Sequence, residues 1–84
     1  MRSNLSLEYD PQADAIYVWL APPGTASHRT DALDDARSVD YDGEGKPIGI
    51  EFLGVTRGID LAEVPEAGAI AKLLARLPAI KAVA

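Results

Sequence analysis

Several carboxylates in the middle of the chain have the spacing of a metal-binding loop. They occupy positions 1, 3, 5 and 12 of the calcium-loop template, and Gly45 supplies the glycine that the template needs at position 6. These acids are Asp40, Asp42, Glu44 and Glu51. The template expects a helix on each side, whereas both flanks alternate apolar and polar residues as strands do, and Pro47 lies inside the loop. We therefore predict an acidic hairpin turn, with a metal site at these acids as the weaker alternative.

Two smaller groupings could support acid–base chemistry, but each has a simpler structural interpretation. Asp10 and Asp14 flank a turn closely enough to suggest a paired-carboxylate site for acid–base work. Aspartates around a proline such as Pro11 also cap tight turns, so we assign both to a turn. His28 and its neighbour Ser27 would point to opposite faces of a strand and could not form a base and nucleophile pair. We find no catalytic constellation and expect a protein that is not an enzyme.

Composition limits the possible partners and cofactors. The chain has no cysteine, which excludes disulfides and thiolate metal sites. It has 13 acidic and 8 basic residues, a formal net charge of −5, and its acids are concentrated between residues 31 and 51. Such a surface repels phosphate backbones, so direct binding of nucleic acid is not expected. The sequence has no phosphate-binding glycine loop or dinucleotide fingerprint, and we predict no cofactor.

Neither a signal peptide nor a membrane span is predicted. The first ten residues lack the apolar core that a signal peptide needs. The longest early apolar run, 15–21, is far shorter than the roughly 20 residues that cross a bilayer. We therefore expect a cytoplasmic protein that does not bind membranes.

The elements that position these residues begin with strands. Period-2 alternation predicts a first strand at residues 5–9, and a run rich in β-branched and aromatic residues predicts its hairpin partner at 15–20. The register of this hairpin stays open, because a shift by one residue exchanges the two faces. A polar edge strand is predicted within 27–33, followed by a second hairpin from 38–41 and 48–52.

The last third of the chain has a helical pattern. Ile70, Leu73, Leu74 and Leu77 recur at i, i+3, i+4 and i+7, so they share one stripe of a helix. We predict a single α+β domain spanning 1–84. It consists of a small antiparallel β-meander of four to five strands (about 5–55), one C-terminal helix on one sheet face (about 60–78) and a tail (79–84).

Tyr17 and Trp19 are the residues that we expect at an interface. On the strand at 15–20 they share one face, while Ile16 and Val18 share the other. Both faces are therefore apolar, and the single predicted helix can cover only one of them. Aromatic residues are enriched in interface cores, and a small domain gains stability by self-association. Packing of both rings inside the chain's own core is the alternative.

Three segments, Tyr9–Val18, Val39–Asp42 and Ile48–Leu53, resemble a bacterial family known as domain of unknown function 2283. The resemblance covers about residues 5–55 and is carried by a Tyr-Asp-Pro-x-Ala-Asp-Ala opening and a Gly-Ile-Glu ending. Trp19 stands where a polar residue is common, and the middle segment is longer than usual. The resemblance implies a small sheet-plus-helix fold without an established activity. Some relatives lie beside genes for small toxin-like proteins, which implies an antitoxin-like role.

The leading hypothesis is a non-enzymatic module that presents a sheet face and acidic loops to another protein. The partner would be a second copy, giving a homodimer, or a basic protein. The alternative is a small-ligand or metal-binding domain, in which the acidic turns near Asp10, Asp14, Asp40 and Asp42 converge.

Overall fold

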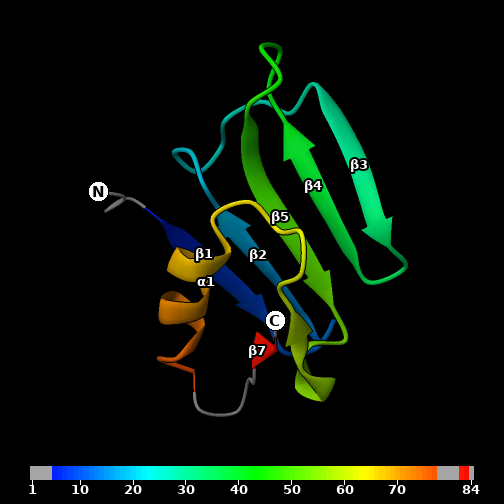
Figure 1. The fold of residues 1–84 in the computed structure, drawn as a ribbon, viewed down its shortest axis with the longest axis vertical. Helices are drawn as coiled ribbons and strands as arrows, with labels where there is room; N and C mark the ends of the chain where they lie inside the picture. Colours follow the sequence, from blue (N-terminus) through cyan, green and yellow to red (C-terminus); the bar gives the residue numbers. More distant parts are fainter. Residues whose placement is uncertain (1–4, 78–81, 84) are drawn as a thin grey trace.

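The computed structural model describes residues 5–77 and 82–83. Its largest element is an antiparallel sheet in the order β1-β2-β5-β4-β3 (Figure 1). The strands are β1 (Ser6–Asp10), β2 (Ala15–Trp19), β3 (Arg29–Asp34), β4 (Arg37–Tyr41) and β5 (Pro47–Leu53). The predicted α+β fold, with up to five antiparallel strands and one helix on one sheet face, is confirmed.

The strand order differs from a simple meander, because β5 lies at the centre between β2 and β4. The sheet joins the β1–β2 hairpin to a β3–β4–β5 meander through the pairing of β2 with β5. Burial explains this order. Strand β5 buries Ile48, Ile50 and Phe52, whereas β3 is almost wholly exposed and polar, so β5 gains most from a central place and β3 tolerates an edge.

The register of the first hairpin, which the sequence left open, pairs Leu7 with Val18. Residues directly opposite each other share a face, so the apolar side chains of β1 lie with the aliphatic side of β2. The turn between the strands is held by Asp10, whose Oδ1 accepts hydrogen bonds from the amides of Gln12 (3.1 Å) and Ala13 (3.2 Å). The predicted capping role of this aspartate is therefore confirmed.

The helical layer is shorter than the predicted 60–78. Helix α1 spans Ala67–Leu74, and the 3₁₀ helix η1 (Val55–Arg57) and the strand β6 (Ile59–Asp60) precede it. Glu63 and Glu66 have positive φ angles of 64° and 60°, which interrupt right-handed helix before α1 begins. Of the predicted tail, 79–81 and 84 lie outside the described residues, and Ala82–Val83 forms β7, parallel to β6.

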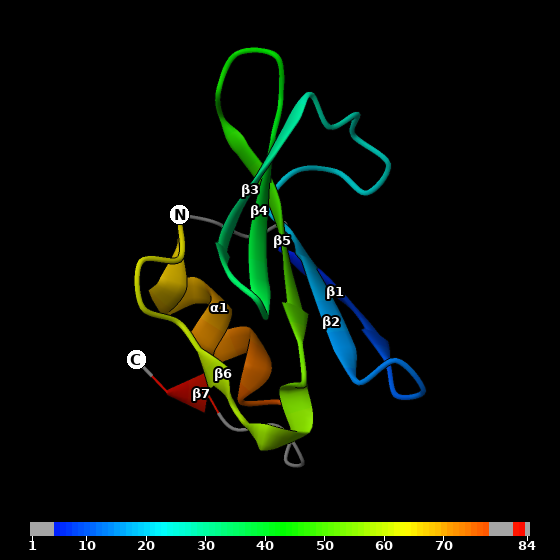
Figure 2. The ribbon, with the colours of Figure 1, turned by 90° about the vertical axis from the view of Figure 1, so that its right-hand side faces the viewer.

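All of these later elements lie on one side of the large sheet (Figure 2). Ile70 and Leu74 of α1 are at most 1% exposed and pack with Ile16, Val18 and other aliphatic side chains of the sheet. Val55, Ile59, Leu61 and Val64 complete this core from the segment between sheet and helix. One face of the sheet is thus covered, and in the described chain no element lies over the other face.

Candidate functional site

The uncovered side of the sheet carries the residues that could bind a partner. Buried Ile16 and Val18 alternate along β2 with half-buried residues whose side chains point away from the helix. Tyr17 of β2 lies directly between its cross-strand neighbours, one on β1 and one on β5. We define the open face as Glu8, Tyr17, Trp19, Asp40 and Glu51.

A hydrogen bond crosses the central strand on this face. The Tyr17 hydroxyl donates to Asp40 Oδ2 at 2.7 Å, although β2 and β4 are separated by β5. The tyrosine ring lies over Gly49, where a Cβ would overlap the hydroxyl group. Thr30 on β3 donates to the other oxygen, Asp40 Oδ1. Both carboxylate oxygens of Asp40 are therefore engaged, and glycine at position 49 makes the crossing possible.

The environment keeps the Tyr17 hydroxyl protonated. Burial raises its pKa, because the phenolate would lose solvation, and the hydrogen bond to Asp40 raises it further. The negative charges of Asp40, Glu51 and Glu8 act in the same direction. Tyr17 is therefore a stable hydrogen-bond donor and not a base at neutral pH.

Two contacts hold the Trp19 side chain in place on the open face. Its ring makes an edge-to-face contact with Tyr17, with centroids 4.8 Å apart and planes at 66°. The indole Nε1 donates to Glu8 Oε2 at 3.0 Å. The two residues predicted at an interface therefore lie together on the open face, each half-buried and each tied to a carboxylate at its polar end.

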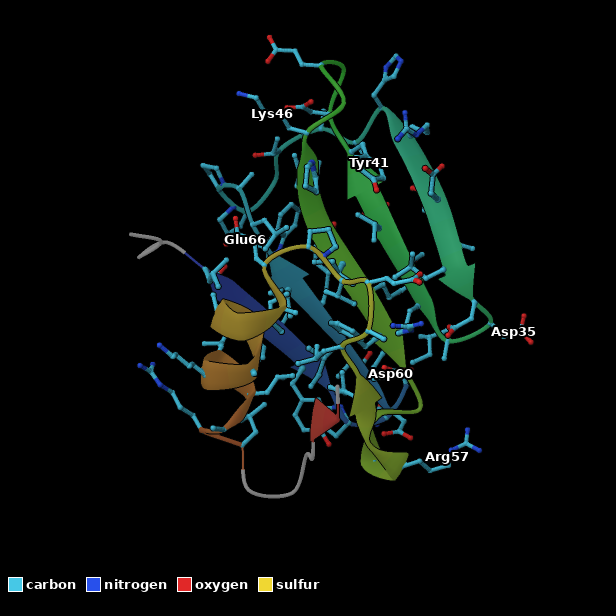
Figure 3. The ribbon with its side chains drawn as sticks, viewed as in Figure 1. Asp35, Tyr41, Lys46, Arg57, Asp60 and Glu66 are labelled. Atoms are coloured by element: carbon cyan, nitrogen blue, oxygen red, sulfur yellow. The ribbon has the colours of Figure 1, made fainter. Side chains whose placement is uncertain are left out.

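The open face has negative charge that no described cation neutralises. Within residues 5–77 and 82–83, neither Glu8, Asp40 nor Glu51 has an ion pair with a basic side chain. The described basic residues that do form ion pairs have other partners: Arg29 with Asp31, Arg37 with Asp34 and Asp60, and Lys46 with Glu44. Lys46 lies near the β4–β5 turn and Arg57 at the opposite end of the molecule (Figure 3).

Residues 6–55 match the family model described as Protein of unknown function (DUF2283). The chain belongs to this family. The match confirms the resemblance predicted from sequence, and it contains the five strands of the large sheet and every residue of the open face. No curated protein and no solved structure matches the chain.

In this DUF2283 chain the acids of the calcium-loop template do not converge. Asp42 closes the β4–β5 turn, where its Oδ1 accepts hydrogen bonds from the amides of Glu44 (2.8 Å) and Lys46 (3.0 Å). The hydrogen bond from the backbone amide of Lys46 is the main cause of the lowered pKa of Asp42. Asp40 and Glu51 instead lie on the sheet. In the part of the chain that the structure describes, no three metal-binding side chains come together.

The acidic turns of the DUF2283 chain also lie apart. The turn at Asp10 and Asp14 is at one end of the sheet and the turn at Asp42 is at the other (Figure 1). Asp14 serves the fold, because its carboxylate accepts hydrogen bonds from the Thr56 amide and hydroxyl, both at 2.9 Å. The two turns therefore do not converge in this structure, as the small-ligand or metal-binding alternative would require.

Helix α1 is also too short to cross a membrane, and no other helix among the described residues of the DUF2283 chain is long and apolar enough to do so.

Proposed function

We propose that this DUF2283 chain is a non-enzymatic interaction module whose open face binds a basic protein. The observation that carries the proposal is the pair of half-buried aromatic rings, Tyr17 and Trp19, framed by carboxylates that no described cation neutralises. Aromatic residues are enriched in the cores of protein interfaces and often contribute most of the binding energy. A ring of negative charge around them favours a partner of positive charge.

A basic partner fits this face better than a second copy of the chain. A two-fold dimer brings the same patch of each subunit against itself. The acids Glu8, Asp40 and Glu51 of one copy would then face the same group of acids on the other copy, and like charges in contact oppose association. A basic toxin would be one such partner, so the antitoxin-like role implied by the resemblance is one form of this activity.

The chemistry of the face supports binding over catalysis. The Tyr17 hydroxyl keeps its proton, and both oxygens of Asp40 already accept hydrogen bonds. General acid–base catalysis needs a group whose pKa lies near the working pH. Tyr17 does not meet that requirement, and the bonds to Asp40 serve to hold the face in shape.

The test is capture of proteins from the native host on the immobilised chain at low salt, followed by purification and calorimetric titration of each captured protein. We expect a basic protein that binds in a stoichiometric complex, more weakly as salt is added. Glu51→Lys should weaken this complex by about tenfold or more, because it reverses a charge on the open face. Glu44→Lys is the matched control, since Glu44 is an exposed acid on the β4–β5 turn.

Two results would overturn the proposal. One is that every captured protein binds Glu51→Lys and the wild type equally, or that no basic protein binds. The other is a dimer in light scattering that Trp19→Ala converts to a monomer, which would assign the open face to a second copy.

A further inference from the structure

The geometry points to an arginine side chain of the partner, bound between Glu51 and the Tyr17–Trp19 pair, as the group that the open face recognises. This inference rests on the proposed function and specifies its ligand chemistry. An arginine site needs a free carboxylate and an ordered aromatic surface beside that carboxylate. It must also favour a guanidinium group over an ammonium group.

Glu51 supplies the free carboxylate. Its side chain is exposed in the middle of β5, and it has no hydrogen bond or ion pair with any described residue. The strand register places it directly beside Tyr17 on β2. Directly opposed residues have Cβ atoms about 5 Å apart, so a group bound to this carboxylate lies within reach of the tyrosine ring.

The aromatic pair supplies an ordered surface. Each ring is anchored at its polar end, Tyr17 by Asp40 and Trp19 by Glu8, and the rings also contact each other. These contacts hold the rings in place before a partner arrives, which lowers the entropy cost of binding. Aromatic faces attract cations, most strongly when the ring is tryptophan. Glu8 and Asp40 add negative charge on the same face.

Selection of arginine over lysine follows from shape and hydration. A guanidinium group is planar, so it can donate paired hydrogen bonds to a carboxylate along one edge while its face lies on a ring. An ammonium group is more strongly hydrated and cannot do both. The fold already contains one such contact elsewhere, because the Arg29 guanidinium lies 4.3 Å from the ring centroid of Tyr41.

The experiment uses the whole chain and short capped peptides in which glycine alternates with arginine, lysine or citrulline. Trp19 is the only tryptophan, so its fluorescence reports binding at the open face directly. At low salt we expect the arginine peptide to bind about fivefold more tightly than the lysine peptide. The citrulline peptide, which has nearly the same shape without the charge, should not bind measurably.

Variants locate the site, with binding measured by calorimetry and folding checked by NMR spectra. Glu51→Gln and Trp19→Leu should each weaken arginine-peptide binding by about threefold to fivefold. Glu44→Gln, which removes an exposed acid outside the open face, should leave the affinity for the arginine peptide unchanged.

The outcomes separate this inference from the proposed function. Equal binding of the arginine and lysine peptides, or arginine binding that survives Glu51→Gln and Trp19→Leu, would overturn the arginine site and leave a basic partner possible. Absence of binding by either charged peptide would overturn it as well, and the proposed function would still be decided by the captured proteins.

Discussion

The Tyr17 hydroxyl reaches Asp40 Oδ2 across an intervening strand, through a 2.7 Å hydrogen bond between residues 23 positions apart in sequence. This contact joins β2 to β4 above the backbone of β5. It orders one ring of the open face and fixes the carboxylate of Asp40. Substitutions at Gly49 and Tyr17 test whether this contact stabilises the fold.

Gly49→Ala should destabilise the protein, because a Cβ at this position would overlap the Tyr17 hydroxyl and ring. Steric overlap at a well-packed site costs about 1–3 kcal/mol. The measurement is the free energy of unfolding from urea titration. Gly43→Ala is the control, since no atom lies near its Cβ position, and it should change stability by no more than about 0.5 kcal/mol. Equal stability of the two variants would contradict the crossing geometry.

Tyr17→Phe should change the alkaline limb of the stability curve. The ordinary pKa of tyrosine is 10.0 and burial raises it in the folded protein, so the unfolded chain ionises first as pH rises. The unfolded state then binds fewer protons, and stability falls with pH above about 10. Phenylalanine removes this contribution. Urea titrations from neutral to strongly alkaline pH should therefore show a shallower decline for the variant than for the wild type.

At neutral pH the same substitution should cost about 1 kcal/mol, the typical net value of a lost hydrogen bond. Asp40 keeps its bond from Thr30, so we expect no collapse of the sheet. A variant as stable as the wild type at neutral pH, with an unchanged alkaline limb, would show that the hydrogen bond is not formed in solution.

Ser6→Ala should leave the protein as stable as the wild type or make it about 1 kcal/mol more stable. The Ser6 hydroxyl oxygen is buried and has no hydrogen-bond partner among the described residues, and a buried polar group without a partner costs free energy. Thermal and urea unfolding would measure the change. Marked destabilisation would indicate that the hydroxyl has a partner in solution.

Arg37→Lys should lower the free energy of unfolding by about 1–3 kcal/mol. The Arg37 side chain is only 11% exposed, and its Nη1 donates to the carbonyl oxygens of Asp60 (3.0 Å) and Ala62 (2.7 Å). Its Nε donates to Asp34 Oδ2 at 3.0 Å. An ammonium group cannot reproduce this fork of donors. Arg57→Lys, at an exposed position, is the control and should be nearly neutral.

Local patterns predicted much of this fold. The alternation along 15–20 identified β2 and its two faces, and the i, i+3, i+4 spacing identified the stripe that buries Ile70 and Leu74. The polar composition of 27–33 correctly indicated an edge strand. These features depend on neighbouring residues only, so one sequence contains the information that they require.

Features that depend on distant residues were missed. Period-2 alternation does not state which strand pairs with which, so the pairing of β2 with β5 could not be read from it. The segment before α1 is also held by a distant residue, because the Arg37 guanidinium donates hydrogen bonds to the carbonyl oxygens of Asp60 and Ala62. Gly49 was the available signal for the Tyr17–Asp40 contact, because a lone glycine within a strand often marks a close approach.

The stretch shared with the DUF2283 family stops at Val55, yet much of what shields the inner sheet from water follows it: Ile59, Leu61, Val64, Ile70 and Leu74. A fragment that ends at Val55 would expose Ile16, Val18 and their apolar neighbours to water on the face that α1 covers. Such a fragment should aggregate. The domain therefore consists of a five-stranded sheet, which the family model covers, and a covering layer supplied by the residues after Val55. Exchanging this covering layer between members of the family should change the solubility of the domain and leave the open face intact.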